Sequence, residues 1–219
     1  MFVGHTALAL AAKRRSPELS LGWLLAAAYA LDLIWPVLLL LGVEQVAFGS
    51  ATGGFDQLTF ISYPWSHSLL TSILWGGLVF GLARWRGVSA LSSLILGALV
   101  VSHWVLDYTS HAPDLPLWPG VSPHVGLGLW SSIPLTFLVE GGLFIAGILL
   151  YVTATKAKDR IGSIGLWALL VTQTAMWASS PWGMAPPSVA ALGWMTLIGE
   201  WAFVAWAWWA DKHRAVLGG

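Results

Sequence analysis

The stretch VSALSSLILGALVVSHWVLDY, residues 88–108, decides the fold class of this chain. It is apolar over the roughly 20 residues that a helix needs to cross a lipid bilayer. Its second half nevertheless carries two ionisable side chains, His103 and Asp107. Ionisable residues inside an apolar span are costly and mark functional sites by default. We therefore expect a membrane-spanning helix that carries part of a site.

The composition of the whole chain agrees with this interpretation. Of its 219 residues, 57% are hydrophobic and only 9% are charged, whereas soluble domains have about 25% charged residues. So few charges cannot cover a water-facing globule of this size, and membrane lipids are the expected partners. The formal net charge of zero argues against a nucleic-acid partner, and the lack of cysteine leaves no disulfide or thiolate chemistry.

Five further apolar segments lie outward from this stretch, so we expect an all-α integral membrane protein with six transmembrane helices. The predicted spans are residues 20–43, 67–83, 88–108, 131–153, 161–178 and 188–209. With these spans all ten Lys and Arg residues fall on one side of the membrane. The positive-inside rule makes that side cytoplasmic, together with both termini. No repeat or linker is visible, so residues 1–219 are taken as one domain.

The apolar segment 2–12 is too short to span the membrane. It precedes the basic residues Lys13, Arg14 and Arg15, which is the reverse of the order in a signal peptide. The segment either lies flat on the inner surface or enters the bundle as a short re-entrant helix. The re-entrant alternative places His5 about 15 Å from the cytoplasmic boundary.

Four predicted spans bring an ionisable residue to a similar depth. Each of these residues lies 16 or 17 positions from the nearest cytoplasmic basic residue, and the four are Asp32, His67, His103 and Glu140. At about 1.5 Å per residue this distance is about 25 Å, in the outer half of the bilayer. We therefore expect one polar layer close to the outer face.

The end of the third span indicates a metal site. His103, Asp107 and His111 are spaced four residues apart and form one stripe on a helix. His103 and Asp107 can ligate one ion, whereas His111 reaches it only if the helix ends there and folds over. The segment 112–114, Ala-Pro-Asp, provides such an end. Imidazole with carboxylate suits Zn²⁺, Mn²⁺ or Fe²⁺. The alternative is a buried ion pair that holds helices together.

Structural roles stay open for the other candidates. Ser66 would make a natural N-cap beside His67, and Asp32 could satisfy a backbone kinked by Pro36. Glu140 is a ligand, a general base or an interhelical hydrogen-bond partner. Three residues of the outer connections are expected to be solvated or turn residues, namely Asp56, Asp114 and His124. The last two could also line a site entrance.

Short motifs within residues 1–120 resemble the LexA-regulated, inner-membrane-bound metal-dependent hydrolases of bacteria. They are Gly4-His5-Thr6, Ala30-Leu31-Asp32, Ser66-His67-Ser68-Leu69-Leu70, Ser102-His103-Trp104-Val105-Leu106-Asp107 and the turn Leu117-Trp118-Pro119-Gly120. The resemblance implies a location in the bacterial cytoplasmic (inner) membrane. It also implies five metal ligands, which are His5, Asp32, His67, His103 and Asp107.

The chain departs from that family at two positions. The family has Pro-Asp-x-Asp where this chain has Leu31-Asp32-Leu33-Ile34, so a second carboxylate is missing. The family also has His-Arg before its Thr-His-Ser motif, where this chain has Ser62-Tyr63. The absent Arg would have supplied a clamp for phosphate or carboxylate.

The leading functional hypothesis is a metal-dependent hydrolase that acts on a lipid or lipid-linked substrate near the outer face. The metal, with Zn²⁺ first and Mn²⁺ or Fe²⁺ as alternatives, would activate water. Glu140 or His111 would act as the general base. A metal-ion or proton-coupled transporter is the second hypothesis, although the inner halves of several spans contain no ionisable group. The third is a non-catalytic metal-binding membrane protein.

Overall fold

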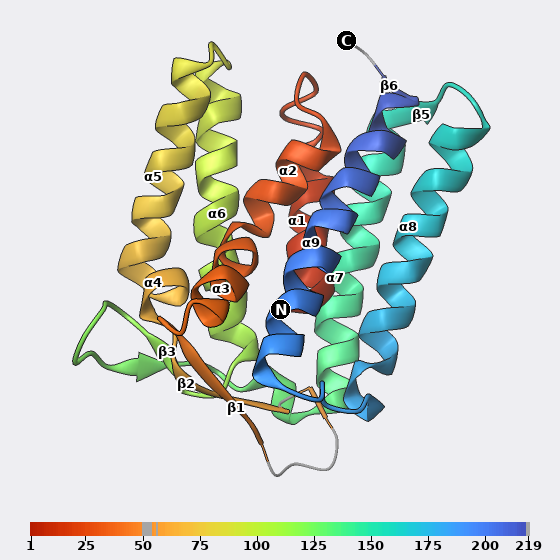
Figure 1. The fold of residues 1–219 in the computed structure, drawn as a ribbon. Coiled ribbons are helices and arrows are strands. Elements are labelled where there is room, and N and C mark those ends of the chain that lie inside the picture. The colour runs from red at the N-terminus through yellow and green to blue at the C-terminus, as the bar shows by residue number, and fades with distance from the viewer. Residues whose placement is uncertain (50–53, 56, 218–219) are drawn as a thin grey trace.

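Helices dominate the computed structural model of the chain, which describes residues 1–49, 54–55 and 57–217. The α-helices are α1 (Phe2–Ala12), α2 (Leu21–Ala28), α3 (Ala30–Leu40), α4 (Pro64–His67), α5 (Leu69–Trp85), α6 (Ala90–Ser110), α7 (Ile133–Ala154), α8 (Arg160–Ser179) and α9 (Val189–Lys212). Two short 3-10 helices complete them, η1 (Leu129–Ser131) and η2 (Ser180–Trp182). The long helices run side by side as a bundle (Figure 1).

Four helices of the described part are long and apolar enough to cross a membrane, namely α6, α7, α8 and α9. The helices α2 and α3 form a fifth candidate, as one span bent by 56°. The helix α5 has 17 residues and is too short to count by the same measure. The expectation of a mostly helical chain with several membrane-length apolar helices is therefore confirmed, whereas the structure supports four or five of the six expected spans.

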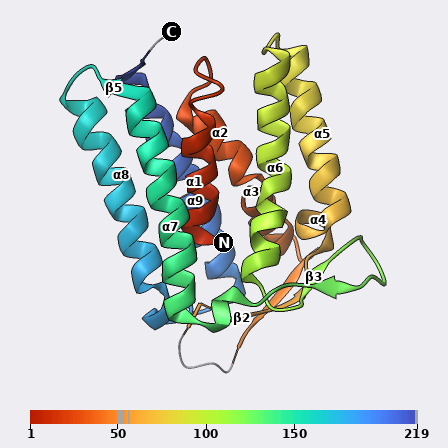
Figure 2. The same ribbon diagram turned by 180° about the vertical axis from the view of Figure 1, so that it is seen from behind.

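The N-terminal helix α1 lies inside the bundle. Figures 1 and 2 show it surrounded by longer helices, with the N-terminus in the interior. Most of its side chains are buried, and it packs most extensively on α7 and then on α2. Gly147 of α7 allows this approach, because a Cβ atom there would lie 2.5 Å from the carbonyl oxygen of Ala7. A helix lying flat on a membrane surface would expose one face, so this burial fits the re-entrant alternative.

Short strands occupy both ends of the bundle, where the sequence indicated only loops. At one end β1 (Gln45–Phe48) pairs with β2 (Leu58–Ser62), and β3 (Leu115–Pro116) pairs with β4 (His124–Val125). At the opposite end β5 (Thr155–Ala157) pairs with β6 (Arg214–Val216). All three pairs are antiparallel.

The basic residues belong to segments at the β5–β6 end, which is at the top of Figure 1. These segments are the α1–α2 connection, the α5–α6 turn, β5 with the start of α8, and the end of α9 with β6. One lysine at this end is buried. The Nζ atom of Lys13 lies 2.8 Å from Oδ2 of Asp211, which also accepts from the backbone N–H of Leu21. This ion pair joins α1 and α2 to the end of α9.

Candidate metal centre

Five ionisable side chains from four helices converge in the half of the bundle away from the basic end. His5 comes from α1, Asp32 from the first turn of α3, and His67 from the end of α4. His103 and Asp107 lie one turn apart near the end of α6. All are buried except Asp32, whose side chain is 30% exposed. The structure thus brings together all five residues predicted as metal ligands.

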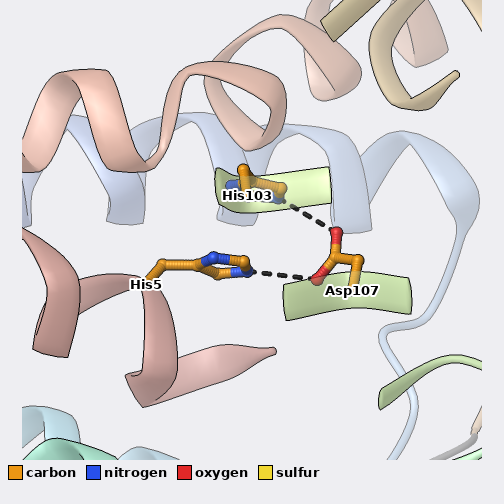
Figure 3. A group of neighbouring side chains, drawn as sticks. All are labelled: His5, His103 and Asp107. Atoms are coloured by element: carbon orange, nitrogen blue, oxygen red, sulfur yellow. Dashed lines mark hydrogen bonds and ion pairs between the residues drawn. The ribbon is translucent and has the colours of Figure 1, made fainter. Parts of the chain in front are cut away.

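Asp107 is at the centre of the cluster. Its Oδ2 atom lies 3.1 Å from Nε2 of His103 and 3.7 Å from Nε2 of His67. Its Oδ1 atom lies 3.2 Å from Nε2 of His5 and also contacts the backbone nitrogen of Met1. Figure 3 shows the imidazoles of His5 and His103 directed at the carboxylate of Asp107.

Asp32 contacts two of these three histidines, His67 and His103. Its Oδ1 atom lies 3.4 Å from Nε2 of His67, and its Oδ2 atom lies 3.5 Å from Nε2 of His103. The rings of His5 and His103 are stacked, with their centroids 3.7 Å apart and an angle of 4° between their planes. Two imidazolium cations would repel each other at this distance, so at most one of these two rings is protonated.

The spacing of these donor atoms fits a metal ion. A tetrahedral ion with bonds of about 2.0–2.1 Å holds its donors about 3.3–3.4 Å apart. The five His–Asp contacts of 3.1–3.7 Å bracket that spacing. Two groups of three donors are close enough to share an ion, His5 with His103 and Asp107, and Asp32 with His67 and His103. The chain therefore has a His/Asp cluster that could hold a metal ion.

His103 has one ring nitrogen available for a metal. Its Nδ1 atom is 2.7 Å from the carbonyl oxygen of Ala28, the last residue of α2. Because a carbonyl only accepts, Nδ1 carries a proton, and in the neutral ring Nε2 has the lone pair. Nε2 of His103 is buried and makes no hydrogen bond among the described residues. This nitrogen lies 3.1 Å from Oδ2 of Asp107 and 3.5 Å from Oδ2 of Asp32, so either a proton or a metal ion would bridge it to these carboxylates.

His67 is oriented by a relay that the sequence analysis missed. Its Nδ1 atom lies 2.7 Å from Oγ of Ser66, which donates to Oε2 of Glu44 at 2.6 Å. Glu44 is buried, and its Oε1 accepts from the backbone N–H groups of Trp65 and Ser66. Glu44 is acceptor-only when ionised, so the proton order leaves Nε2 of His67 free to bind a metal.

Ser66 is therefore not a helix N-cap, which was the structural role considered for it from the sequence. Ser68 caps α5 instead, and it accepts from the backbone N–H of Thr71. Only one feature of the sequence pointed to the role of Glu44 in this relay. It is an acidic residue placed just after an apolar span. Glu44 lies in the connection between α3 and β1, so no helical spacing related it to His67.

A cavity of about 110 Å³ adjoins the cluster. Four of its lining residues are polar, namely Asp32, His67, Asp107 and His111. A larger groove of about 420 Å³ lies between α2 and the α5–α6 pair, but apart from Arg86 its lining is apolar. The smaller cavity is the candidate site because its wall carries the ligand atoms.

His111 lies on the cavity wall but outside both groups of metal donors. The helix α6 ends at Ser110, and His111 has extended backbone angles, as the Ala-Pro-Asp segment predicted. Its Nδ1 atom lies 3.2 Å from Oδ1 of Asp114, which also accepts from the hydroxyl of Tyr63 at 2.8 Å. Burial and the Asp114 carboxylate raise the pKa of the Tyr63 hydroxyl, so this group stays a donor.

Glu140 is buried on α7 behind the cavity wall. Its Oε1 atom accepts from Nε1 of Trp130 at 2.8 Å, and Trp130 lines the cavity. Its Oε2 atom is buried and makes no hydrogen bond among the described residues. Glu140 belongs to neither group of metal donors. The geometry therefore places His111 closer to any reacting group than Glu140.

The remaining outer-loop candidates do not join the cluster. His124 is exposed on β4, and Asp114 contacts the cavity-lining residue His111 but does not itself line the cavity. Asp56 lies outside the described residues.

Comparison of the chain with known protein families, curated proteins and solved structures finds no match. The geometry of the cluster and its cavity therefore carries the functional argument.

Proposed function

We propose that this chain is a metal-dependent hydrolase embedded in the bacterial cytoplasmic membrane, similar to the LexA-regulated inner-membrane hydrolases. Its metal, with Zn²⁺ as the first choice, would be held by His5, Asp32, His67, His103 and Asp107 or by a subset of them. The substrate would be a lipid or lipid-linked molecule. The cavity beside the ligand atoms supports this proposal, because catalytic metal sites keep a coordination position open to substrate and water.

Each chain would bind one metal ion. Both groups of three donors include His103, and its Nδ1 atom donates a hydrogen bond to the carbonyl oxygen of Ala28. The single remaining lone pair on Nε2 serves one ion. Such an ion lowers the pKa of bound water and polarises the group under attack.

Side chains of the protein would then accept and transfer the proton of the attacking water. His111 faces the cavity, and its Nδ1 atom is held by Asp114, so Nε2 is free to accept a proton there. The hydrogen bond to Asp114 stabilises the imidazolium that forms. Glu140 would hold Trp130 in the cavity wall and would not touch the substrate.

The site would lie near the outer face if six segments span the membrane. In this topology the bent α2–α3 pair is one span, and the short α4 extends α5 toward the outer side. The basic end of the bundle would then be cytoplasmic by the positive-inside rule. A lipid could approach from the outer leaflet.

Hydrolysis of lipid substrates by the purified protein tests the proposal. Protein in detergent is stripped of metal with a chelator, reloaded with Zn²⁺, and assayed against lipids that carry ester, amide or phosphate bonds. Activity should disappear with the metal, return on reloading, and be lost in Asp107→Ala. The matched control His124→Ala alters an exposed histidine at the same end and should keep full activity. A metal-loaded wild-type chain that hydrolyses none of these lipids would contradict the proposal.

A further inference from the structure

The charges of the candidate site discriminate between classes of substrate, if the chain is the hydrolase proposed above. All ten Lys and Arg residues lie within the described part of the chain and belong to the β5–β6 end. The cavity adjoins the cluster in the other half of the bundle, and none of its described lining residues is Lys or Arg. No long cationic side chain is therefore available to hold an anion beside the ligand atoms.

The loaded centre would have no net charge from its ligands and metal. Asp32 and Asp107 supply two negative charges, and a divalent ion supplies two positive ones. The three histidine ligands bind as neutral rings, because each nitrogen that binds a metal must be unprotonated. Two further charged groups lie close by, the terminal ammonium of Met1, which contacts Oδ1 of Asp107, and the buried carboxylate of Glu140. As an ammonium and a carboxylate they add one charge of each sign, so the sum stays zero. The centre is balanced before the substrate arrives.

A phosphate ester would disturb this balance. It would bring one or two negative charges into a buried site where the terminal nitrogen of Met1, a cation beside the ligand atoms, is already held by Asp107. An uncompensated charge in such surroundings costs several kcal/mol. A neutral acyl carbonyl carries no such cost, and the ion can still polarise its oxygen.

The cavity wall also suits an uncharged group. Besides the polar residues, it is formed by Met1 and by the aromatic side chains of Phe2, Trp35, Phe60 and Trp130. The volume of about 110 Å³ admits the reacting group, and the acyl chain would extend beyond it.

We propose that the substrate of this site is an uncharged acyl ester or acyl amide of a lipid, and not a phosphate ester. In the reaction the oxygen of one water molecule bonds to the carbonyl carbon, and the C–O or C–N bond breaks. One proton of that water passes through His111 to the leaving oxygen or nitrogen. The other leaves with the fatty acid product.

Two ligands of equal chain length test the substrate class without turnover. The first is a fatty hydroxamate, which is neutral at pH 7, and the second is an alkylphosphonate, which is anionic. Their dissociation constants are measured by calorimetry with Zn²⁺-loaded wild-type protein in a neutral detergent. Each is corrected for the affinity of the ligand for free Zn²⁺. The same titrations with His103→Ala report the binding that does not depend on the metal.

The hydroxamate should bind at least about tenfold more tightly than the phosphonate, equivalent to about 1.4 kcal/mol. The preference should disappear in His103→Ala. Lipids with an ester or amide bond should also be hydrolysed faster than lipids with a phosphate ester bond. Comparison of the ester lipid with the amide lipid shows which acyl bond is cleaved. Tighter binding of the phosphonate, or equal binding of both, would overturn the substrate class while leaving a metal-dependent hydrolase in place. A wild-type chain that binds no Zn²⁺ would overturn the hydrolase itself.

Discussion

At the scale of single residues, two histidines of the cluster have their ring protons fixed by partners outside it. Ala28 accepts from His103, and the Ser66–Glu44 pair accepts from His67. Both interactions aim an Nε2 lone pair at the carboxylates. Partners of this kind orient a ligand, and their loss costs metal affinity without removing any ligand.

Ser66→Ala should therefore weaken metal binding although Ser66 touches no metal. The change removes the acceptor of the His67 Nδ1 proton and leaves Glu44 without its hydroxyl partner. We expect a loss of about 10- to 100-fold in affinity, measured by competition with a fluorescent chelator. Ser102→Ala is the matched control, because the Ser102 hydroxyl bonds to Leu99 of its own helix. Equal affinities in both variants would refute the relay.

His111→Ala should slow turnover and leave metal binding intact. His111 lines the cavity but belongs to neither donor group. Loss of a general base typically costs about 10²- to 10⁴-fold in rate. Steady-state kinetics and metal content are measured on the same preparation. Loss of the metal in this variant would make His111 a ligand, and an unchanged rate would remove it from the reaction.

The sequence predicted the cluster better than its surroundings. Depth relative to the basic residues aligned Asp32, His67 and His103, because helical rise converts sequence separation into height. His5 depended on the re-entrant alternative and on the family resemblance. Glu44 was missed because it lies in a connection without regular geometry, where separation along the chain gives no position in space.

At the scale of elements, the approach of α1 to α7 determines where His5 lies. The two helices meet where Gly147 faces the backbone of Ala7. Their contact needs a residue without a Cβ atom, as at many close helix crossings in membranes. The sequence offered two alternatives for residues 2–12 and could not choose between them, since periodicity does not report which neighbours cover a short apolar helix.

Gly147→Ala should push α1 away and weaken the metal site from a distance. The new Cβ atom would lie 2.5 Å from the carbonyl oxygen of Ala7, so one of the helices must shift. We expect destabilisation of about 1–3 kcal/mol, measured by thermal unfolding in detergent, together with reduced metal affinity. Gly142→Ala on the same helix is the control, because a Cβ atom there meets nothing within 4 Å. Similar effects of both changes would contradict this packing.

At the scale of the whole molecule, the bundle has a basic end and an end that carries the β1–β2 and β3–β4 pairs (Figures 1 and 2). The distribution of charge along the sequence predicted this separation. The number of spans was harder to predict. The bend between α2 and α3 and the short α5 depend on tertiary packing, which hydropathy alone does not describe.

The topology predicts opposite labelling of the two ends. The chain contains no cysteine, so single-cysteine variants need no background removed. Val121→Cys, between β3 and β4, should react with a membrane-impermeant maleimide in intact cells. Trp85→Cys, at the end of α5, should react only after the membrane is permeabilised. Labelling of both from the same side would contradict the proposed orientation.

The metal content of the purified protein tests the central claim most directly. Elemental analysis of the wild-type chain, expressed in metal-replete medium and purified in detergent without chelators, should find about one divalent ion per chain. His103→Ala should lose that ion, and His124→Ala should retain it. A folded wild-type protein without a stoichiometric ion, or a His103→Ala variant that keeps one, would contradict the account.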